Sequence, residues 1–254
     1  MMQLPYSLER TVLICAERKT VFRYFTESNL FAEWWGAGSN IDGRPGGSLK
    51  IVYPDGTIAS GQVIETVANE RIVFTYGYED SSKPIPPGGS RVTITLADRR
   101  GGTWLTLKHE LADAQARDHH VQGWSYQLAL FANAAAGLQH ADLDSVIDRY
   151  FAAWAERDAI ARRQHLAELS VPDIVFQDRF GCTAGLDELS AHVAASQIHM
   201  PGVTVHRSGN ARQCQGTALA DWEARSSEGK ALGRGTNLFL LAPDGRIVRV
   251  VGFW

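Results

Sequence analysis

The chain has 254 residues, 44% of them hydrophobic and 21% charged, and its formal net charge at pH 7 is −3. This composition is typical of a folded globular protein, and no apolar run reaches the roughly 18 to 20 residues that a membrane-spanning helix needs. Basic and acidic residues are nearly balanced in both halves, 13 against 14 up to residue 140 and 12 against 14 after it, so we expect neither a nucleic acid nor a membrane as partner.

The first half of the sequence predicts a strand, two short helices and then a run of strands. Residues 8–14 alternate as a strand does, and Val21, Phe22 and Phe25 recur at helical spacing within residues 17–27. A second short helix is expected over residues 29–35. Turn dipeptides separate most of the later strands. The proline-rich stretch over residues 83–89 is expected to be a loop, because proline has no N–H to donate to a sheet. The expected strands cover residues 49–53, 58–67, 71–78, 91–96 and 104–110.

A long helix is predicted over residues 113–137. Its apolar positions, among them Val121, Trp124, Leu128 and Phe131, fall on one stripe. Such a stripe is typical of a helix that packs against a sheet. Gly137 is expected to end the helix.

The second half places its helices first and its strands last. Helices are expected over residues 143–156, 159–169 and 186–197, with a strand over 174–178 between the second and the third. Four strands then close the chain, and they are expected over residues 204–208, 218–224, 233–241 and 247–253.

The two halves therefore follow different plans, and we predict two α+β domains, each with antiparallel strands, that cover residues 1–140 and 141–254. A single parallel α/β sheet would need strands and helices to alternate throughout. Helical periodicity breaks at Gly137 and resumes in a new phase at Leu143, so the boundary is expected in the short link between them.

Six ordered segments of the first domain match one family pattern. They are residues 16–22 (AERKTVF), 34–36 (WWG), 44–47 (RPGG), 71–76 (RIVFTY), 103–110 (TWLTLKHE) and 120–124 (HVQGW). The domain thereby resembles the helix-grip superfamily of START-related proteins, in the branch named after the activator of heat-shock-protein-90 ATPase homologues. The resemblance implies an antiparallel sheet around a long C-terminal helix with an apolar cavity between them. It does not imply a chaperone role.

Segments of the second domain match a different pattern. They include residues 149–154 (RYFAAW), 175–178 (VFQD), 185–189 (GLDEL), 235–237 (GTN) and 244–247 (DGRI). The domain resembles the nuclear-transport-factor-2-like superfamily, on its SnoaL-like, polyketide-cyclase-like side, which implies a cone-shaped curved-sheet α+β barrel. That superfamily contains isomerases, dehydratases, hydrolases and cyclases, and also members that only bind or dimerise, so the fold alone does not decide the chemistry.

The resemblance to the isomerases of this superfamily implies three catalytic candidates. Asp178 falls where they keep a carboxylate base, while Tyr150 and Asn237 fall where they keep the two donors of an oxyanion hole. A carboxylate can abstract a C–H proton while such donors stabilise the resulting enolate. The alternative is structural, because an aspartate that ends a strand often accepts from the amides of the following turn.

Large aromatic residues of the second domain alternate with polar neighbours. This pattern predicts that they form the core and that some of them line a pocket. Phe253 belongs to this core set. His192 and His206 are either pocket acids or bases, or packed residues. The residues expected to bind a ligand here are Trp154, Phe176, His192, Trp222 and Phe239.

The first domain contains many large apolar residues, and its sequence shows no pair of a nucleophile and a base. Every second residue of the strand over residues 71–78 is large and apolar or aromatic, so this face should meet the long helix. His120 is either a polar contact at the end of a cavity or a structural hydrogen-bonding residue. The residues expected to bind a ligand in this domain are Trp34, Trp35, Phe74, Tyr76, His120, Trp124 and Leu128.

The three cysteines, Cys15, Cys182 and Cys214, are far apart and odd in number. This spacing favours neither a zinc site nor a disulfide framework. The N-terminal residues also lack the pattern of a secretion signal. We therefore expect no metal, no cofactor and a cytoplasmic location.

Three functions remain open on the sequence alone. The first is binding of a small apolar or aromatic metabolite in one or both domains. The second is isomerase, cyclase, dehydratase or hydrolase activity with Asp178 as base. The third is a regulatory role in which the second domain forms a homodimer through the open face of its sheet, where Arg207, Arg212, Trp222 and Arg225 are expected.

Overall fold

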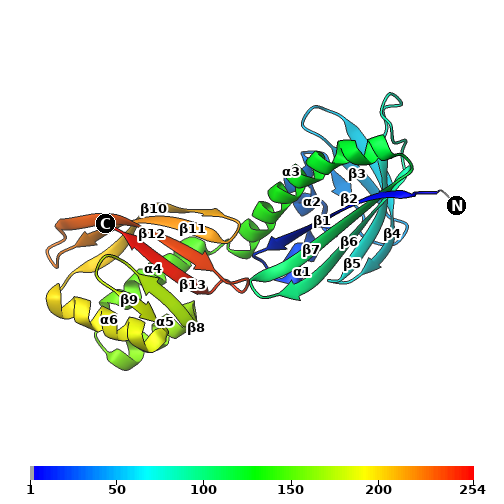
Figure 1. The fold of residues 1–254 in the computed structure, drawn as a ribbon. Helices are drawn as coiled ribbons and strands as arrows, with labels where there is room; N and C mark the ends of the chain where they lie inside the picture. Colours follow the sequence, from blue (N-terminus) through cyan, green and yellow to red (C-terminus); the bar gives the residue numbers. More distant parts are fainter. Residues whose placement is uncertain (1–2) are drawn as a thin grey trace. The chain divides into compact units, whose positions relative to one another are not determined.

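The computed structural model describes residues 3–254, which divide into two units. The first unit ends at Leu138 and the second spans Gln139–Trp254. Each unit combines one sheet with helices (Figure 1). Each also has a hydrophobic cluster of its own. The predicted α+β class with two domains is therefore confirmed.

The described part of the first unit forms an antiparallel sheet of seven strands in the order β1-β7-β6-β5-β4-β3-β2. Strands β2 to β7 follow one another as neighbours, and β1 pairs with β7. The strands are β1 (Tyr6–Ile14), β2 (Asn40–Ile41), β3 (Ser48–Val52), β4 (Ile58–Val67), β5 (Arg71–Tyr78), β6 (Ser90–Arg99) and β7 (Gly102–Leu111). The helices are α1 (Arg18–Arg23), α2 (Ser28–Trp35) and α3 (Ala114–Gln139).

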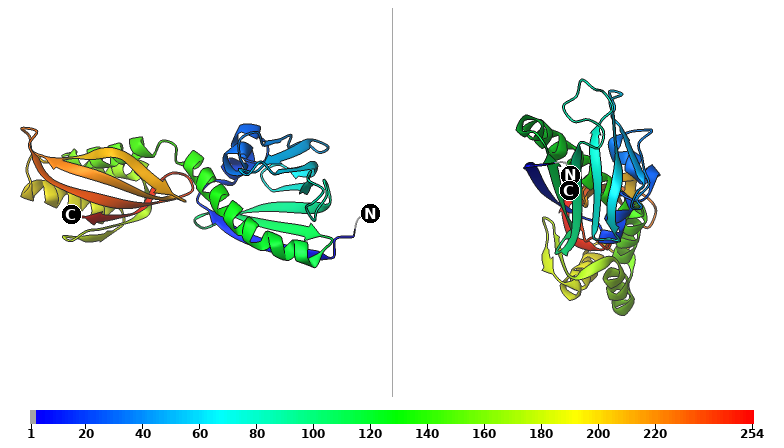
Figure 2. Two further views of the ribbon diagram at one scale, coloured as in Figure 1. Left: turned by 90° about the horizontal axis from the view of Figure 1, so that it is seen from above. Right: turned by 90° about the vertical axis from the view of Figure 1, so that its right-hand side faces the viewer.

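Helix α3 packs one long face into the core of the first unit (Figures 1 and 2). Its start is capped by Asp113, whose Oδ1 accepts from the backbone N–H of Ala116 at 2.8 Å. The predicted stop at Gly137 is wrong, because the helix continues to Gln139. A single glycine costs a helix only about 1 kcal/mol relative to alanine, which the surrounding turns can offset.

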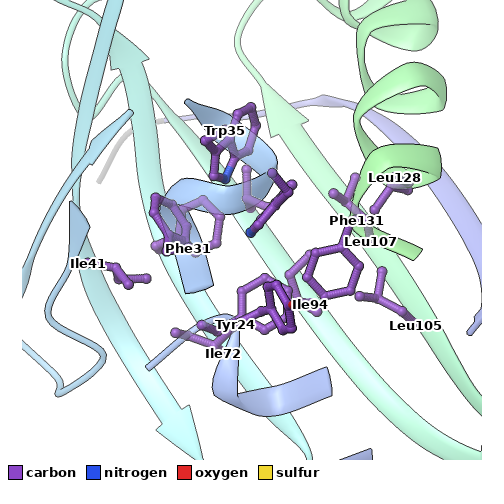
Figure 3. Packing of buried hydrophobic residues seen from close by; sticks show 14 of the residues in the cluster. Tyr24, Phe31, Trp35, Ile41, Ile72, Ile94, Leu105, Leu107, Leu128 and Phe131 are labelled. Carbon is purple, nitrogen blue, oxygen red and sulfur yellow. The ribbon is translucent and has the colours of Figure 1, made fainter. Parts of the chain in front are cut away.

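The core of the first unit is dominated by aromatic rings. Phe131 of α3 packs edge-on against Tyr24 and Trp34, with ring centroids 5.4 and 4.8 Å apart, and stacks on Phe25 at 5.2 Å. Figure 3 shows Phe131 and Leu128 of the helix beside the inward-facing residues of β7. Offset and edge-on ring pairs add stability beyond the area that they bury.

The second unit has three helices on one side of a curved sheet of six strands (Figure 2). The strand order in its described residues is β10-β11-β12-β13-β8-β9. The strands are β8 (Ser170–Gln177), β9 (Cys182–Ala184), β10 (Thr204–Cys214), β11 (Thr217–Arg225), β12 (Ala231–Leu241) and β13 (Ile247–Phe253). The helices are α4 (Leu143–Ala155), α5 (Ala159–Leu169) and α6 (Leu186–His199).

Two features of this sheet differ from the sequence prediction. The sheet does not close into a barrel within residues 139–254, because β10 and β9 are open edges. Its strands are also not all antiparallel, since β13 pairs with β8 in parallel. The parallel pairing is possible because four further strands and α6 separate β8 from β13 in the chain, which leaves ample length for a crossover.

The longest helix of residues 3–254 is α3, with 26 residues. No helix in this part of the chain has both the length and the hydropathy required to cross a membrane.

Candidate functional site

The second unit contains a cavity of about 390 Å³ between the sheet and helices α4 and α6. Alternation along β11 turns Trp222 and Ala224 into it, while α4 contributes residues one turn apart. Apolar and aromatic groups make up most of the wall. The aromatic residues that line it are Phe151, Trp154, Phe176, Trp222 and Trp254.

Asp178 follows the last residue of β8 and lines this cavity. Its Oδ1 accepts from the backbone N–H groups of Phe180 and Gly181, at 2.8 and 2.9 Å. Asp178 thus makes the turn contacts that the structural alternative predicts, and it is also part of the cavity wall.

Asn237 lines the same cavity from β12, where it faces Gly252 of β13. The indole N–H of Trp222 donates to its Oδ1 at 2.9 Å. Because that N–H can only donate, the contact fixes the orientation of the amide and leaves its Nδ2 as the remaining donor. A Cβ placed on Gly252 would lie 3.2 Å from both Asn237 Oδ1 and Asp178 Cβ, so these two candidate side chains are close to each other.

Tyr150 is completely buried on α4 and is not among the residues that line the cavity. Its ring packs on Phe239 and Trp154 at 5.5 and 6.2 Å. Its hydroxyl has no hydrogen-bond partner in residues 3–254. Burial raises the pKa of this hydroxyl well above its ordinary value, and the Asp178 carboxylate adds to the rise.

The two histidines singled out in this domain lie elsewhere. His192 is half-buried on α6 and packs on Phe176 and Trp154, with centroids 5.2 and 5.9 Å apart, so it supports the cavity wall from behind. His206 is exposed on β10 and interacts with Thr204 at 2.8 Å.

Several sequence expectations about side-chain direction are wrong. Phe253 is 59% exposed, whereas Gly252 and Trp254 line the cavity. Side chains of a strand alternate between its faces, and Phe253 falls on the outer one. Trp222 and Arg207 do not lie on the open face, because Trp222 lines the cavity and Arg207 pairs with Asp148 of α4 at 2.9 Å.

The first unit brings its predicted residues together as a packed core. Trp34 and Trp35 are buried on α2 with centroids 4.4 Å apart, and Trp35 packs on Trp124 at 5.6 Å. Phe74, Tyr76 and Leu128 belong to the same cluster. The indole N–H groups of Trp34 and Trp35 are buried without a partner in residues 3–254.

His120 is engaged at both ring nitrogens. Its Nδ1 lies 2.7 Å from the carbonyl oxygen of Ala116, which can only accept, so Nδ1 carries the proton. Its Nε2 then accepts from the hydroxyl of Tyr78 at 3.1 Å. Burial lowers the pKa of His120, which favours this neutral form. These contacts agree with the second of its two predicted roles, that of a structural hydrogen-bonding residue.

The comparisons with known proteins agree with this division of the chain. The family model of the activator of Hsp90 ATPase homolog 1-like proteins (AHSA1) matches residues 16–136, and that of the SnoaL-like domain matches residues 147–250. The chain consists of an AHSA1-like domain followed by a SnoaL-like domain. Domains of these families commonly bind hydrophobic ligands or act as cyclases or isomerases. No curated protein matches the chain.

Solved structures similar to each domain were also found. A putative isomerase of the SnoaL-like family from Agrobacterium tumefaciens is 26% identical, and the match covers 46% of this chain and 97% of that one at a TM-score of 0.42. An AHSA1-like protein from Rhizobium etli is 29% identical over 54% of this chain and 88% of its own, at 0.43. The Aha1 dimer from Colwellia psychrerythraea is 15% identical over 48% and 90%, at 0.42.

The sequence missed part of the cavity wall in the SnoaL-like domain. The C-terminal turns of α6 contribute Ser196 and Gln197, and the segment after them contributes Met200 and Pro201. Gln197 is held there by its Nε2, which donates to the carbonyl oxygen of Trp154 at 2.7 Å. The sequence signal for this part was weak, because α6 carries no apolar stripe at its C-terminal end.

Proposed function

We propose that the protein binds a small, largely apolar or aromatic molecule in the cavity of its SnoaL-like domain. The observation that carries the proposal is the cavity itself, about 390 Å³ in volume and walled mainly by aromatic and aliphatic side chains. Ligand pockets have this character, with a few polar groups that set the orientation of the ligand. Asp178 and Asn237 supply such groups here.

Ligand binding can be tested with Nile red, a neutral dye whose emission rises in apolar surroundings. We expect the full-length protein to bind it with saturation. In Ala224→Phe the new ring should occupy the cavity that Ala224 lines and abolish binding, while the melting temperature stays close to that of the wild type. Ala191→Phe is the matched control, since Ala191 is exposed on α6. Equal binding by the wild type and Ala224→Phe would contradict the proposal.

Proton transfer is the second candidate function, because Asp178 and Asn237 line one cavity and lie close together. In that case the protein should catalyse exchange of the C–H protons next to the carbonyl of an apolar ketone, such as 2-tetralone, for deuterium. NMR spectra measure the rate of this exchange. Asp178→Asn should slow the exchange by ~10² to 10⁴-fold, as expected for a removed general base. A folded Asp178→Asn protein with undiminished exchange would end this reading.

We also propose that the protein is cytoplasmic. A further proposal is that the SnoaL-like domain forms a homodimer through the outer face of β10–β12. The outer face carries Arg225 and Arg234, both paired with Glu223, and a bond from Thr236 to Asp221. Its mixed polar and aliphatic character suits an interface that also tolerates water. Sedimentation that shows a monomer at all accessible concentrations would remove the dimer.

A further inference from the structure

One charged side chain lines the cavity of the SnoaL-like domain. Of the described residues that line it, Asp178 alone has a charged side chain, and the other polar side chains, such as Ser196, Gln197 and Asn237, are neutral. Asp178 is half-buried. A ligand that covers this carboxylate without pairing with it removes the charge from water at a cost, so the carboxylate influences which head group the site favours.

The turn that follows β8 holds the Asp178 carboxylate in position. Its Oδ1 accepts two backbone N–H bonds from Phe180 and Gly181. Its Oδ2 makes no hydrogen bond or ion pair with any residue in the range 3–254, so one oxygen of an anchored carboxylate remains available.

The arginines that flank Asp178 in the fold are engaged elsewhere. The guanidinium of Arg179 lies over the rings of Phe180 and Trp254, at 4.7 and 5.8 Å from their centroids. Arg249 donates from Nη2 to the side chain of Gln177. No ion pair within residues 3–254 involves Asp178. The negative charge at the cavity is therefore not neutralised by the protein.

Aromatic walls around a carboxylate form the environment that an organic cation prefers. The negative faces of Trp and Phe rings attract an ammonium group, most strongly where water is excluded. Five aromatic residues line this cavity together with Asp178. A neutral ligand would leave the carboxylate without a partner, and an anionic ligand would be repelled by it.

We infer that the ligand of this cavity is a lipophilic amine, whose ammonium group pairs with Asp178 Oδ2 while its apolar body fills the aromatic walls. The inference rests on the proposed binding function and specifies its ligand class. It gives Asp178 the role of a charge anchor, which differs from that of a general base because no proton is removed from carbon.

Three indole compounds with one ring system and different head groups test the inference: tryptamine, tryptophol and indole-3-acetate. Titration calorimetry on the full-length protein at pH 7 should show that the amine binds roughly tenfold more tightly than the alcohol, and that the acid binds most weakly. Asp178→Asn should lose this preference, so that its affinities for tryptamine and tryptophol lie within threefold of each other. Asp173→Asn, an exposed aspartate of β8, is the matched control and should keep the preference.

The results separate failure of the inference from failure of the proposed function. Nile red binding without a preference for the amine overturns the inference alone, and so does an amine preference that survives in Asp178→Asn. If neither Nile red nor any of the three indoles binds, the binding function fails, and the inference fails with it. The comparison among the three indoles uses only the wild-type protein, so it holds even where Asp178→Asn does not fold.

Discussion

His109 of the AHSA1-like domain is a fully buried histidine whose protonation state can be read from its neighbours. The indole N–H of Trp124 donates to its Nδ1 at 3.0 Å, so Nδ1 is an acceptor and Nε2 carries the proton. Nε2 then donates to Ser90 Oγ at 2.8 Å, and Ser90 donates to the carbonyl oxygen of Tyr76. In this arrangement His109 cannot accept a proton from Ser90, so the pair is structural and not a nucleophile with its base.

His109 should make the AHSA1-like domain sensitive to acid. Burial, with a smaller contribution from His120, lowers its pKa from the ordinary 6.5 to about 3. Between these two values the unfolded chain binds a proton that the folded chain does not, so stability falls as the pH drops from 6.5 towards 3. The expected slope for one such group is about 1.4 kcal/mol per pH unit. His109→Gln should flatten this dependence.

The measurement is urea unfolding between pH 4 and pH 7, followed by the Trp124 indole N–H signal in NMR spectra. Trp124 reports on the AHSA1-like domain alone. His119→Gln is the control, because His119 is exposed on the same helix as His120. Equal pH slopes in the wild type and His109→Gln would show that His109 does not govern acid unfolding.

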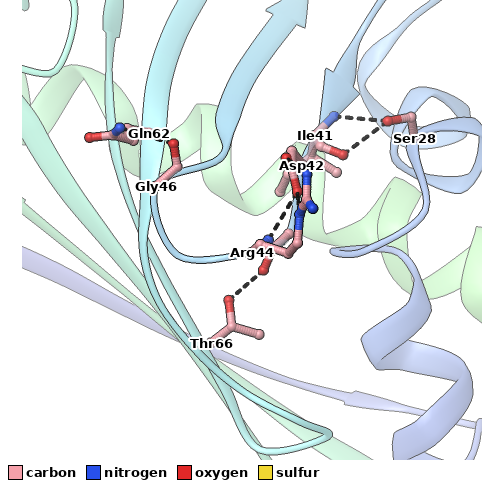
Figure 4. Close-up of polar contacts among 8 residues, drawn as sticks. Ser28, Ile41, Asp42, Arg44, Gly46, Gln62 and Thr66 are labelled. Atoms are coloured by element: carbon pink, nitrogen blue, oxygen red, sulfur yellow. Dashed lines mark hydrogen bonds and ion pairs between the residues drawn. The ribbon is translucent and has the colours of Figure 1, made fainter.

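At the scale of elements, the loop between β2 and β3 shows how a short motif fixes a strand connection (Figure 4). Arg44 pairs with Asp42 at 2.7 Å, and the hydroxyl of Thr66 on β4 donates to the carbonyl oxygen of Gly43 at 2.6 Å. Gln62 donates from its side chain to the carbonyl oxygen of Gly46 at 3.0 Å. The loop is thus tied to β4 at two points.

Two of the three glycines of this loop, Gly46 and Gly47, should respond differently to a methyl group. Gly46 has a φ of +87° with open space around it, so Gly46→Ala should cost roughly 1 kcal/mol of stability through the backbone alone. A Cβ on Gly47 would overlap the carbonyl oxygen of Asp42, and overpacking of this kind costs about 1–3 kcal/mol. Gly47→Ala should therefore be the more destabilising change in thermal melts of the AHSA1-like domain. The reverse order would refute this account of the loop.

Local patterns predicted most elements of this chain, and distant contacts decided what they missed. The bounds of β4, β5, β13 and α5 agree with the sequence prediction, because turn or capping residues such as Asp55-Gly56, Asp158 and Asp244-Gly245 mark where these elements begin. The two-residue strand β2 and the three-residue strand β9 were missed. Strands this short have no period of their own, and their neighbours β3 and β8 define them.

The candidate site was predictable to a similar degree. Asp178, Asn237, Trp154, Phe176 and Trp222 were all selected from the sequence and all line the cavity. The sequence could not show that Tyr150 lies outside the lining, since that depends on how α4 is seated against β12. It also could not show that Asp178 lacks a cation as partner, because the sequence does not determine which way the nearby Arg179 and Arg249 turn.

At the scale of the whole molecule, the hydrophobic residues gather into two clusters that have no member in common. One contains buried residues from Leu8 to Ala135, and the other contains buried residues from Leu143 to Val250. Each cluster is built from a complete sheet and the helices next to it in the sequence. A unit with its own core can fold without the rest of the chain.

We therefore expect the fragments 1–139 and 142–254 to fold independently, with the domain boundary in the link between them. Each fragment should give a cooperative thermal transition and dispersed NMR signals, because neither loses a strand of its sheet. Fragment 1–112 is the control, since it lacks α3 and with it buried core residues such as Trp124, Leu128 and Phe131. Removal of several such side chains at about 3–5 kcal/mol each exceeds the stability of an ordinary domain, so this fragment should not fold. If 1–139 and 142–254 are both unfolded while the full-length chain is folded, the two domains depend on each other and the proposed boundary is wrong.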